Sequence, residues 1–306
     1  MTTGVAAEAV ATGLPGSGVA IAADGLGKRY GKAWALRECT FALPAGRVVA
    51  LVGANGAGKS ALLSVLAGVL APTAGRVSLG KVVRRPIGGA DGRVAFVAQD
   101  KPLYRQFSVA DMLRLGGRLN EVWDQARARR WLERFDIPLN RPCGKLSGGQ
   151  QAQVAFAVAL GSRPSVLLLD EPLANLDPLA RREVTAELLT EVADSGMTVL
   201  LSTHVVAELG GVADHLLLLD HGRLRLDGDL DELLAAHVRW IGPRSADPPV
   251  PGEVVHVRHT ESQSQFLLRM PGGATAPVAE PPWTTRPVTL EDLVLAHLST
   301  SKESAA

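Results

Sequence analysis

The chain has 306 residues, which is enough for one large domain with an appendage or for two domains. Apolar residues make up 46% and charged residues 21%, an ordinary globular composition that argues against global disorder. Because 32 Lys and Arg face 31 Asp and Glu, the net charge of +1 provides no basic field for bulk nucleic acid or an anionic membrane surface. We therefore expect no nucleic-acid partner. Two cysteines, Cys39 and Cys143, cannot build a disulfide framework and suit a reducing compartment.

The N-terminal residues 1–18 are rich in Ala, Gly and Thr, lack a basic start, and contain Glu8 within their apolar stretch. We expect a flexible tail there, not a secretion signal. No apolar run of the sequence approaches the ~18 residues that a membrane-spanning helix needs. Any work at a membrane is therefore expected to pass through a partner chain.

Residues 19–237 alternate short apolar runs with helical patterns, which predicts a mixed α/β sheet flanked by helices. Strands are predicted at 47–52, 93–98, 165–169, 198–203, 215–220 and 223–227. Helices are predicted at 59–66, 108–117, 123–135 and 178–193. The last helix has Asp177 as its cap and Pro178 at its first position, and Val184, Leu188 and Val192 give it a buried stripe.

Composition changes after about residue 238, because nine of the 19 prolines lie between residues 243 and 287. We place a domain boundary there, expect regular structure to thin out, and predict a small α+β extension over residues 238–306. A hairpin is predicted at 254–270, and a terminal helix capped by Thr289 is predicted to run to residue 298. The role of this extension stays open between a dimer contact, a regulatory flap and an inert appendage.

Residues 53–60, Gly-Ala-Asn-Gly-Ala-Gly-Lys-Ser, fit the phosphate-binding pattern G-x-x-x-x-G-K-[ST] between a predicted strand and a predicted helix. Glycines let backbone amides approach phosphate oxygens, and the helix start adds partial positive charge. Lys59 is expected to neutralise the outer phosphates, and the Ser60 hydroxyl to ligate Mg²⁺. The predicted nucleotide contacts are Gly53, Asn55, Gly56, Ala57, Gly58, Lys59, Ser60 and Ala61.

A second signal lies where the apolar strand near 165–169 ends in Asp170 and Glu171. Beside a phosphate cradle, Asp170 is expected to hold the Mg²⁺ shell and Glu171 to polarise or orient the attacking water. An Asp-Glu pair after a strand is also common in ordinary loops, but the cradle upstream favours the catalytic interpretation.

Between these two motifs, residues 146–150 read Leu-Ser-Gly-Gly-Gln. This ordered set of motifs resembles the ATP-binding subunits of ABC transporters over roughly residues 19–237. The resemblance implies a P-loop NTPase fold with an inserted helical subdomain at about residues 100–145. It also implies ATP and Mg²⁺ as ligands and ATP hydrolysis as the activity.

The resemblance implies three further contacts with the nucleotide bound to the same chain. Tyr30 is expected to stack on adenine, Gln99 to contact Mg²⁺ and the attacking water, and His204 to contact the γ-phosphate. Each residue also has an ordinary structural interpretation. The tyrosine could be half-buried only for its apolar surface, the glutamine could be a surface residue after a strand, and the histidine could be a packing or capping residue.

Other residues are expected, by the same resemblance, to act on the partner subunit's nucleotide across a dimer interface. The first group is Ser147, Gly148, Gly149 and Gln150. The second is Asp177, in the loop Asn175-Leu176-Asp177, which is expected to cross the dimer interface. A serine before two glycines at a helix start also fits a plain cap. Two departures from the family pattern are Ala61, where a second hydroxyl is frequent, and Gln151-Ala152-Gln153, where arginines are frequent.

The resemblance implies a head-to-tail homodimer that drives a separate transmembrane permease. This predicts a cytoplasmic protein held at the inner face of the cell membrane. Export is the expected direction, because similar tails occur in export-type members. Phe107, Trp123 and Trp131 either dock a permease helix or pack the small helices, and packing is favoured for the two tryptophans.

The alternative is a soluble ABC-type ATPase that acts outside transport, on ribosomes, DNA or cluster assembly. One phosphate cradle, a net charge of +1 and the lack of a long coiled-coil insertion disfavour it. A nucleotide-binding scaffold without hydrolysis is disfavoured by the presence of Glu171 and His204.

Overall fold

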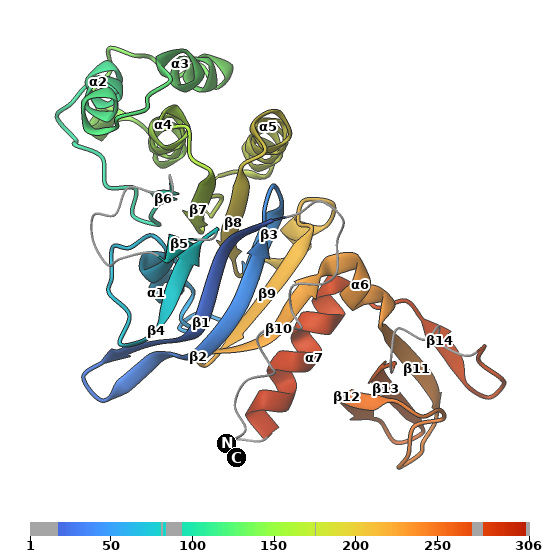
Figure 1. Ribbon diagram of the computed structural model, residues 1–306. Helices are drawn as coiled ribbons and strands as arrows, with labels where there is room; N and C mark the ends of the chain where they lie inside the picture. Colours follow the sequence, from blue (N-terminus) through green and yellow to red (C-terminus); the bar gives the residue numbers. More distant parts are fainter. Residues whose placement is uncertain (1–17, 81, 84–93, 175, 271–277, 304–306) are drawn as a thin grey trace.

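The computed structural model describes residues 18–80, 82–83, 94–174, 176–270 and 278–303, which form three sheets and their covering helices (Figure 1). The predicted N-terminal tail lies outside these ranges except for Gly18, and Asn175 lies outside them as well.

The central sheet has six strands in the order β10-β9-β3-β8-β7-β6. Five strands are parallel and β10 runs antiparallel to β9. Their bounds are β3 (Val48–Val52), β6 (Val94–Val97), β7 (Val166–Asp170), β8 (Thr198–Thr203), β9 (His215–Asp220) and β10 (Arg223–Asp229). Every residue of β3, β7 and β8 is buried, which explains their apolar runs without alternation. The predicted mixed α/β sheet and its strands are confirmed.

A second, antiparallel sheet has the order β2-β1-β4-β5. Its strands are β1 (Val19–Tyr30), β2 (Ala33–Pro44), β4 (Ala74–Leu79) and β5 (Val82–Val83). None of these strands was predicted from the sequence. Its side chains Ile21, Leu26 and Leu36 share a buried cluster with Leu62 and Leu66 of helix α1 (Lys59–Leu66), whose bounds match the prediction. This sheet thereby supports the helix that follows the phosphate cradle.

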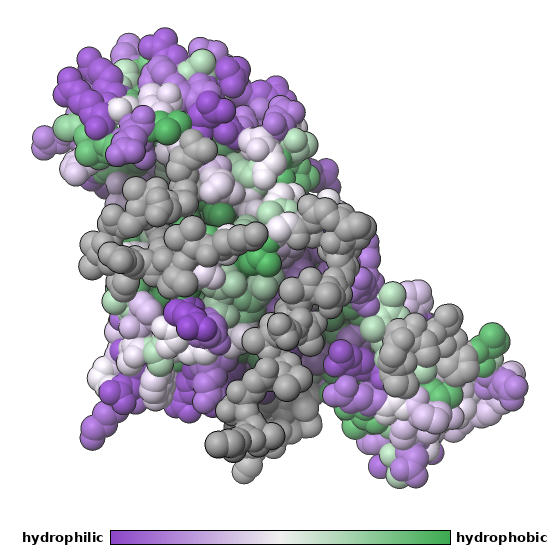
Figure 2. Space-filling model, in the orientation of Figure 1, coloured by the Kyte–Doolittle hydropathy of each residue, from purple (hydrophilic) through white to green (hydrophobic). Residues whose placement is uncertain are grey.

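Helices α2 (Val109–Leu119), α3 (Gln125–Arg134) and α4 (Gly148–Gly161) gather at one end of the molecule (Figure 1). Trp131 is 1% exposed, and its Nε1 donates to Gln153 Oε1 at 2.9 Å. Trp123 lies so close to Gly116 and Gly161 that a Cβ on either glycine would be 2.6 Å from its ring. Both tryptophans therefore pack these helices, as predicted. The outer surface at this end is mainly hydrophilic (Figure 2).

Helix α5 (Pro178–Ser195) begins as predicted. Asp177 Oδ1 accepts hydrogen bonds from the amides of Leu179 and Ala180 at 3.0 Å each. The predicted stripe of Val184, Leu188 and Val192 is buried. Across the described part of the chain, none of the helices combines the length and the apolar character needed to traverse a bilayer.

A third sheet occupies the C-terminal region, in the order β12-β13-β11-β14, with all pairs antiparallel. The elements are α6 (Leu230–Ala235), β11 (His237–Pro243), β12 (Glu253–His259), β13 (Gln263–Arg269), β14 (Thr284–Arg286) and α7 (Leu290–Glu303). The hairpin and the terminal helix were predicted. The expectation that regular structure thins out after residue 238 was wrong, because prolines such as Pro243 end strands or stand between them.

Helix α7 has two buried faces. Leu293 and Ala296 pack with Val255 and Leu267 of the third sheet. Val294 belongs instead to the main core, together with Leu209 of the short helix η2 (Val206–Leu209), which α7 contacts. The third sheet is therefore anchored to the body of the protein through a packed helix.

Replacing Leu293 with Ala tests this anchor. The side chain is fully buried, so the substitution should lower the free energy of unfolding by about 2–5 kcal/mol. Leu295→Ala on the same helix is the matched control, because that side chain is 54% exposed and its loss should stay within about 0.5 kcal/mol. Urea denaturation followed by circular dichroism measures both, and equal effects would contradict the described packing.

Candidate nucleotide-binding and catalytic site

The phosphate cradle is the loop between the end of β3 and the start of α1. Gly58 has φ 108°, and a Cβ there would lie 2.5 Å from the carbonyl oxygen of Ala35. A Cβ on Gly53 would lie 2.3 Å from the carbonyl oxygen of Leu219. These two positions therefore require glycine. Among the described residues, no side chain caps α1 at Gly58, and the amides of a helix's first turn are the groups that bind anions.

Lys59 is the buried cation of this loop, with 5% exposure. Its Nζ donates to the carbonyl oxygens of Gly53 at 2.7 Å and Ala54 at 3.3 Å, and it lies 3.8 Å from Glu171 Oε1. Burial lowers the pKa of Lys59, while the charges of Glu171 and Asp170 oppose that shift. The carbonyl contacts hold the ammonium in the loop that phosphates would enter.

The other cradle residues differ in accessibility. Asn55, Gly56 and Ser60 are exposed, whereas Ala57 is buried, and Gly58 and Ala61 are half-buried. The Ser60 hydroxyl stands at the exposed start of α1. At Ala61 only the backbone amide remains for a phosphate contact.

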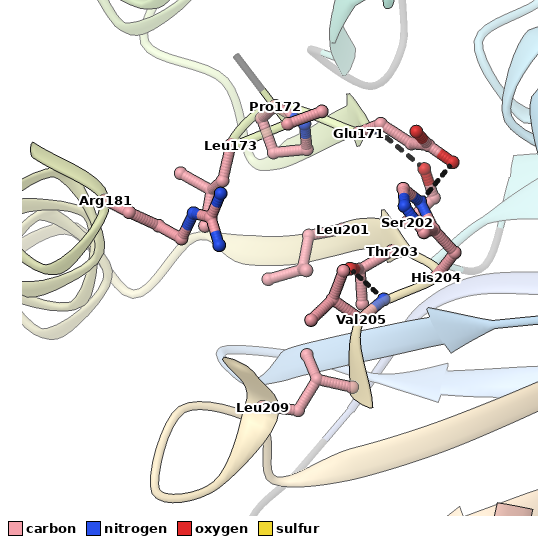
Figure 3. A pocket seen from close by; sticks show the side chains of 11 residues that line it. Glu171, Pro172, Leu173, Arg181, Leu201, Ser202, Thr203, His204, Val205 and Leu209 are labelled. Atoms are coloured by element: carbon pink, nitrogen blue, oxygen red, sulfur yellow. Dashed lines mark hydrogen bonds and ion pairs between the residues drawn. The ribbon is translucent and has the colours of Figure 1, made fainter. Parts of the chain in front are cut away.

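Two carboxylates stand where β7 ends, beside the end of β8. Figure 3 shows the second of them, Glu171. Asp170 is 4% exposed, and its Oδ1 accepts from the Ser202 hydroxyl at 2.7 Å. Glu171 follows with φ 46°, in the left-handed region, and its amide donates to the same hydroxyl at 2.9 Å. Glu171 Oε1 lies 3.1 Å from Nδ1 of His204, which follows β8. The fold thus gathers Lys59, Asp170, Glu171 and His204 at one edge of the sheet.

The residues predicted to hold Mg²⁺ carry oxygen donors that suit a hard divalent cation. Asp170 supplies carboxylate oxygen and Ser60 supplies hydroxyl oxygen, the ligand types that Mg²⁺ prefers. Gln99, also predicted as a ligand, is exposed just beyond the end of β6, which pairs with β7. In the described ranges no cluster of three His, Cys, Asp or Glu side chains offers a separate all-protein metal centre.

Tyr30 is the last residue of β1 and is 51% exposed. The Nζ of Lys28 lies 5.3 Å from the centroid of its ring, at cation–π distance. Its ring is therefore not packed in the core, and Lys28 lies over one of its faces.

The predicted signature forms the start of α4. Ser147 Oγ accepts from the amide of Gln150 at 3.2 Å, and Gln150 Oε1 accepts from the amide of Ser147 at 3.1 Å. A Cβ on Gly149 would lie 3.0 Å from Leu176 Cδ2, so the signature touches the residue before Asp177. Within the described ranges, no hydrogen bond or ion pair joins residues 147–150 to Lys59 or Glu171.

Side chains after the signature hold α4 in place. Gln151 Nε2 donates to the carbonyl oxygen of Leu146 at 3.0 Å, and Gln153 accepts from Trp131 of α3. The glutamines that depart from the family pattern therefore tether the signature helix by neutral hydrogen bonds. The sequence carried no signal for these partners.

A cavity of about 150 Å³ lies behind Glu171 (Figure 3). Its lining residues are Glu171, Pro172, Leu173, Ala174, Arg181, Leu201, Ser202, Thr203, His204, Val205 and Leu209. No cradle residue lines it, so it adjoins the catalytic edge and is not the nucleotide site itself.

The comparisons with known proteins identify the family of this chain. Residues 36–174 match the family model described as ABC transporter. The aliphatic sulfonates import ATP-binding protein SsuB of Escherichia coli K12 is 39% identical over 257 residues, which cover 83% of this chain and 91% of that protein. The chain belongs to the ABC transporter family of ATP-binding proteins. As a member of that family it is an ABC ATPase.

A second relative and a solved structure are also similar to this ABC ATPase. The molybdenum import ATP-binding protein ModC of Mycobacterium tuberculosis H37Rv is 38% identical over 224 residues, 68% of this chain, and the chain spans 61% of its length. A solved ATP-binding subunit of an ABC transporter is 28% identical, with a TM-score of 0.61 over 70% of this chain and 91% of that one. This confirms the P-loop NTPase fold. Both named relatives are import proteins, so the expected export direction has no support.

Proposed function

We propose that the chain binds Mg·ATP in the loop 53–60, hydrolyses it as a head-to-tail dimer, and thereby powers a transmembrane permease. The observation that carries this proposal is the convergence of Lys59, Glu171 and His204. The Nζ and Nδ1 atoms of the two basic side chains lie 3.8 and 3.1 Å from one carboxylate oxygen, at the edge where the phosphate cradle opens. A buried cation, an acid and a histidine in this arrangement suit phosphoryl transfer to water.

Each residue then has a role in the proposed reaction. Lys59 and the amides of the cradle bind and neutralise the phosphates. Glu171 orients the attacking water and accepts its proton, and His204 contacts the γ-phosphate. Mg²⁺, when bound, neutralises charge that develops on the phosphoryl group.

The residues proposed to hold Mg²⁺ are Ser60, Gln99 and Asp170. Tyr30 is proposed as the adenine platform. Its support is that its face is exposed at the end of a strand.

The dimer is proposed because one chain carries the cradle and the signature as separate groups. Ser147, Gly148, Gly149 and Gln150 form an exposed or half-exposed helix start, suited to an anion supplied from outside the chain. Asp177 is exposed on the neighbouring loop, and Leu176 touches the signature. Two copies related head to tail would place each signature over the other copy's ATP.

Replacing Glu171 with Gln tests the proposed water-orienting role. The side chain keeps its shape and loses its charge, so ATP turnover should fall at least 100-fold while ATP still binds. The ATP-bound dimer should then accumulate, as measured by light scattering after size exclusion with Mg·ATP. Lys59→Ala is the control, because it removes phosphate neutralisation and should abolish both binding and dimerisation. Wild-type turnover in the Glu171→Gln protein would refute the role.

A mixing experiment tests whether the signature acts in trans. Lys59→Ala destroys the cradle and Ser147→Arg destroys the signature, so each variant alone should be inactive. A mixed dimer pairs the intact cradle of the Ser147→Arg copy with the intact signature of the Lys59→Ala copy. ATP hydrolysis should therefore reappear on mixing. If the mixture stays inactive while wild-type homodimers hydrolyse ATP, the trans arrangement is wrong.

The permease is proposed to dock beside the helical group, which would hold the chain at the inner face of the cell membrane. Tyr104 and Phe107 are 61% and 39% exposed, with ring centroids 5.1 Å apart, just before α2. They give an exposed apolar surface that follows Gln99 closely in the sequence, and Gln99 is proposed to hold Mg²⁺. Relatives named for transport support a permease over a soluble ATPase, and export is not part of the proposal.

Replacing both Tyr104 and Phe107 with Ala tests this contact. Because their rings are largely outside the core, the ATPase rate of the isolated chain should change less than twofold. Co-purification of the permease from detergent-solubilised membranes should be lost. Leu119→Ala is the matched control, since it removes a 75% exposed apolar side chain at the end of α2. Undiminished co-purification of the double variant would contradict this docking site.

A further inference from the structure

The Ser202 hydroxyl lies between the two carboxylate residues of the candidate site. Ser202 is fully buried near the end of β8, and the parallel register sets it opposite Asp170 of β7. It donates one hydrogen bond, to Asp170 Oδ1 at 2.7 Å, and accepts one, from the Glu171 amide at 2.9 Å. A hydroxyl supplies one donor and can accept as well, so a single side chain serves both residues.

Toward Asp170, the hydrogen bond fixes the orientation of a buried carboxylate. Oδ1 is directed at Ser202, which sets the plane of the group and leaves Oδ2 as the oxygen for a metal ion. A partner that orients a metal-ligating carboxylate in this way raises metal affinity without touching the metal. Asp170 is proposed as a Mg²⁺ ligand, so the hydroxyl belongs to its supporting shell.

Toward Glu171, the hydrogen bond stabilises an unfavourable backbone. The φ of 46° is a left-handed conformation, which is unfavourable for a residue with a Cβ. That turn directs the Glu171 side chain to His204 (Figure 3). The same carboxylate oxygen lies near Lys59 Nζ. Without Ser202 the Glu171 amide would lose its partner, and the left-handed turn would lose a stabilising contact.

We propose that Ser202 is a positioning residue for ATP hydrolysis, which holds the metal-binding carboxylate of Asp170 and the water-orienting carboxylate of Glu171 in one geometry. This rests on the proposed function and deepens it. We assign Ser202 no direct contact with nucleotide or metal. It acts through the two carboxylates, and its loss should affect catalysis and Mg²⁺ dependence together.

The test compares three full-length variants with the wild type. Ser202→Ala removes the hydroxyl, and Ser202→Thr restores it, with the added methyl adjoining the 150 Å³ cavity that Ser202 lines. Thr198→Ala is the matched control from the other end of β8. Thr198 is 1% exposed, and its hydroxyl also accepts a backbone amide, that of Gly46 at 2.9 Å. The Thr198→Ala variant therefore measures how the loss of a buried hydroxyl from the same strand affects stability and activity.

For Ser202→Ala, kcat should fall by about 10–100-fold, and the Mg²⁺ concentration for half-maximal ATPase rate should rise by a similar factor. Binding of fluorescently labelled ATP in EDTA should stay within twofold of wild type, since Ser202 is outside the cradle. Ser202→Thr should recover most of the rate. Thr198→Ala should lower the melting temperature and leave kcat and the Mg²⁺ midpoint unchanged.

Three outcomes would overturn the proposal. Ser202→Ala could match the wild type in kcat and Mg²⁺ midpoint. The Thr198→Ala control could lose as much activity per folded molecule, which would make the effect structural. Ser202→Thr could be folded yet as inactive as Ser202→Ala. A wild-type chain without ATPase activity would instead refute the proposed function itself, which separates the two failures.

Discussion

In the central sheet, β7 and β8 run parallel with Asp170 paired to Ser202, so both strands end at the same edge. Glu171 and His204 are the residues just beyond that edge. The cradle reaches it as well, because β3 pairs with the other side of β8 and ends at Val52 opposite Thr203. The hydrogen-bond register of three neighbouring strands therefore sets the distances among the candidate groups. A slip by one residue would direct these side chains to opposite faces.

Charge balance explains why the cluster is stable before a nucleotide arrives. Lys59 is buried, and burial lowers its pKa, while the Glu171 and Asp170 charges favour its protonated form. The carbonyl oxygens of Gly53 and Ala54 complete its shell. An incoming phosphate attracts the ammonium more strongly than these neutral carbonyls do, because it carries negative charge. When ATP binds, the Lys59 ammonium would exchange these carbonyl oxygens for phosphate oxygens. It would therefore keep a partner throughout.

The sequence was most informative where structure is local. The strand–loop–helix around residues 53–60 could be predicted because its glycines, its lysine and its apolar flanks are contiguous. β1 and β2 were missed because repeated register shifts break their alternation, and the charges of Lys28 and Arg29 lie within β1. Ser202 was missed as a supporting residue because its partners lie 31 and 32 positions away, and only strand pairing brings them together. The roles of Tyr30, Gln99 and the signature stay predictions, since their partners would be a nucleotide and a second subunit.

The C-terminal sheet is connected to the same edge by packing. Val294 of α7 and Leu209 are buried in one cluster, and Leu209 also lines the cavity behind Glu171. The short helix that ends in Leu209 begins at Val206, two positions after His204. The buried contacts on both faces of α7 therefore hold the extension against the main core, next to the turn that carries His204.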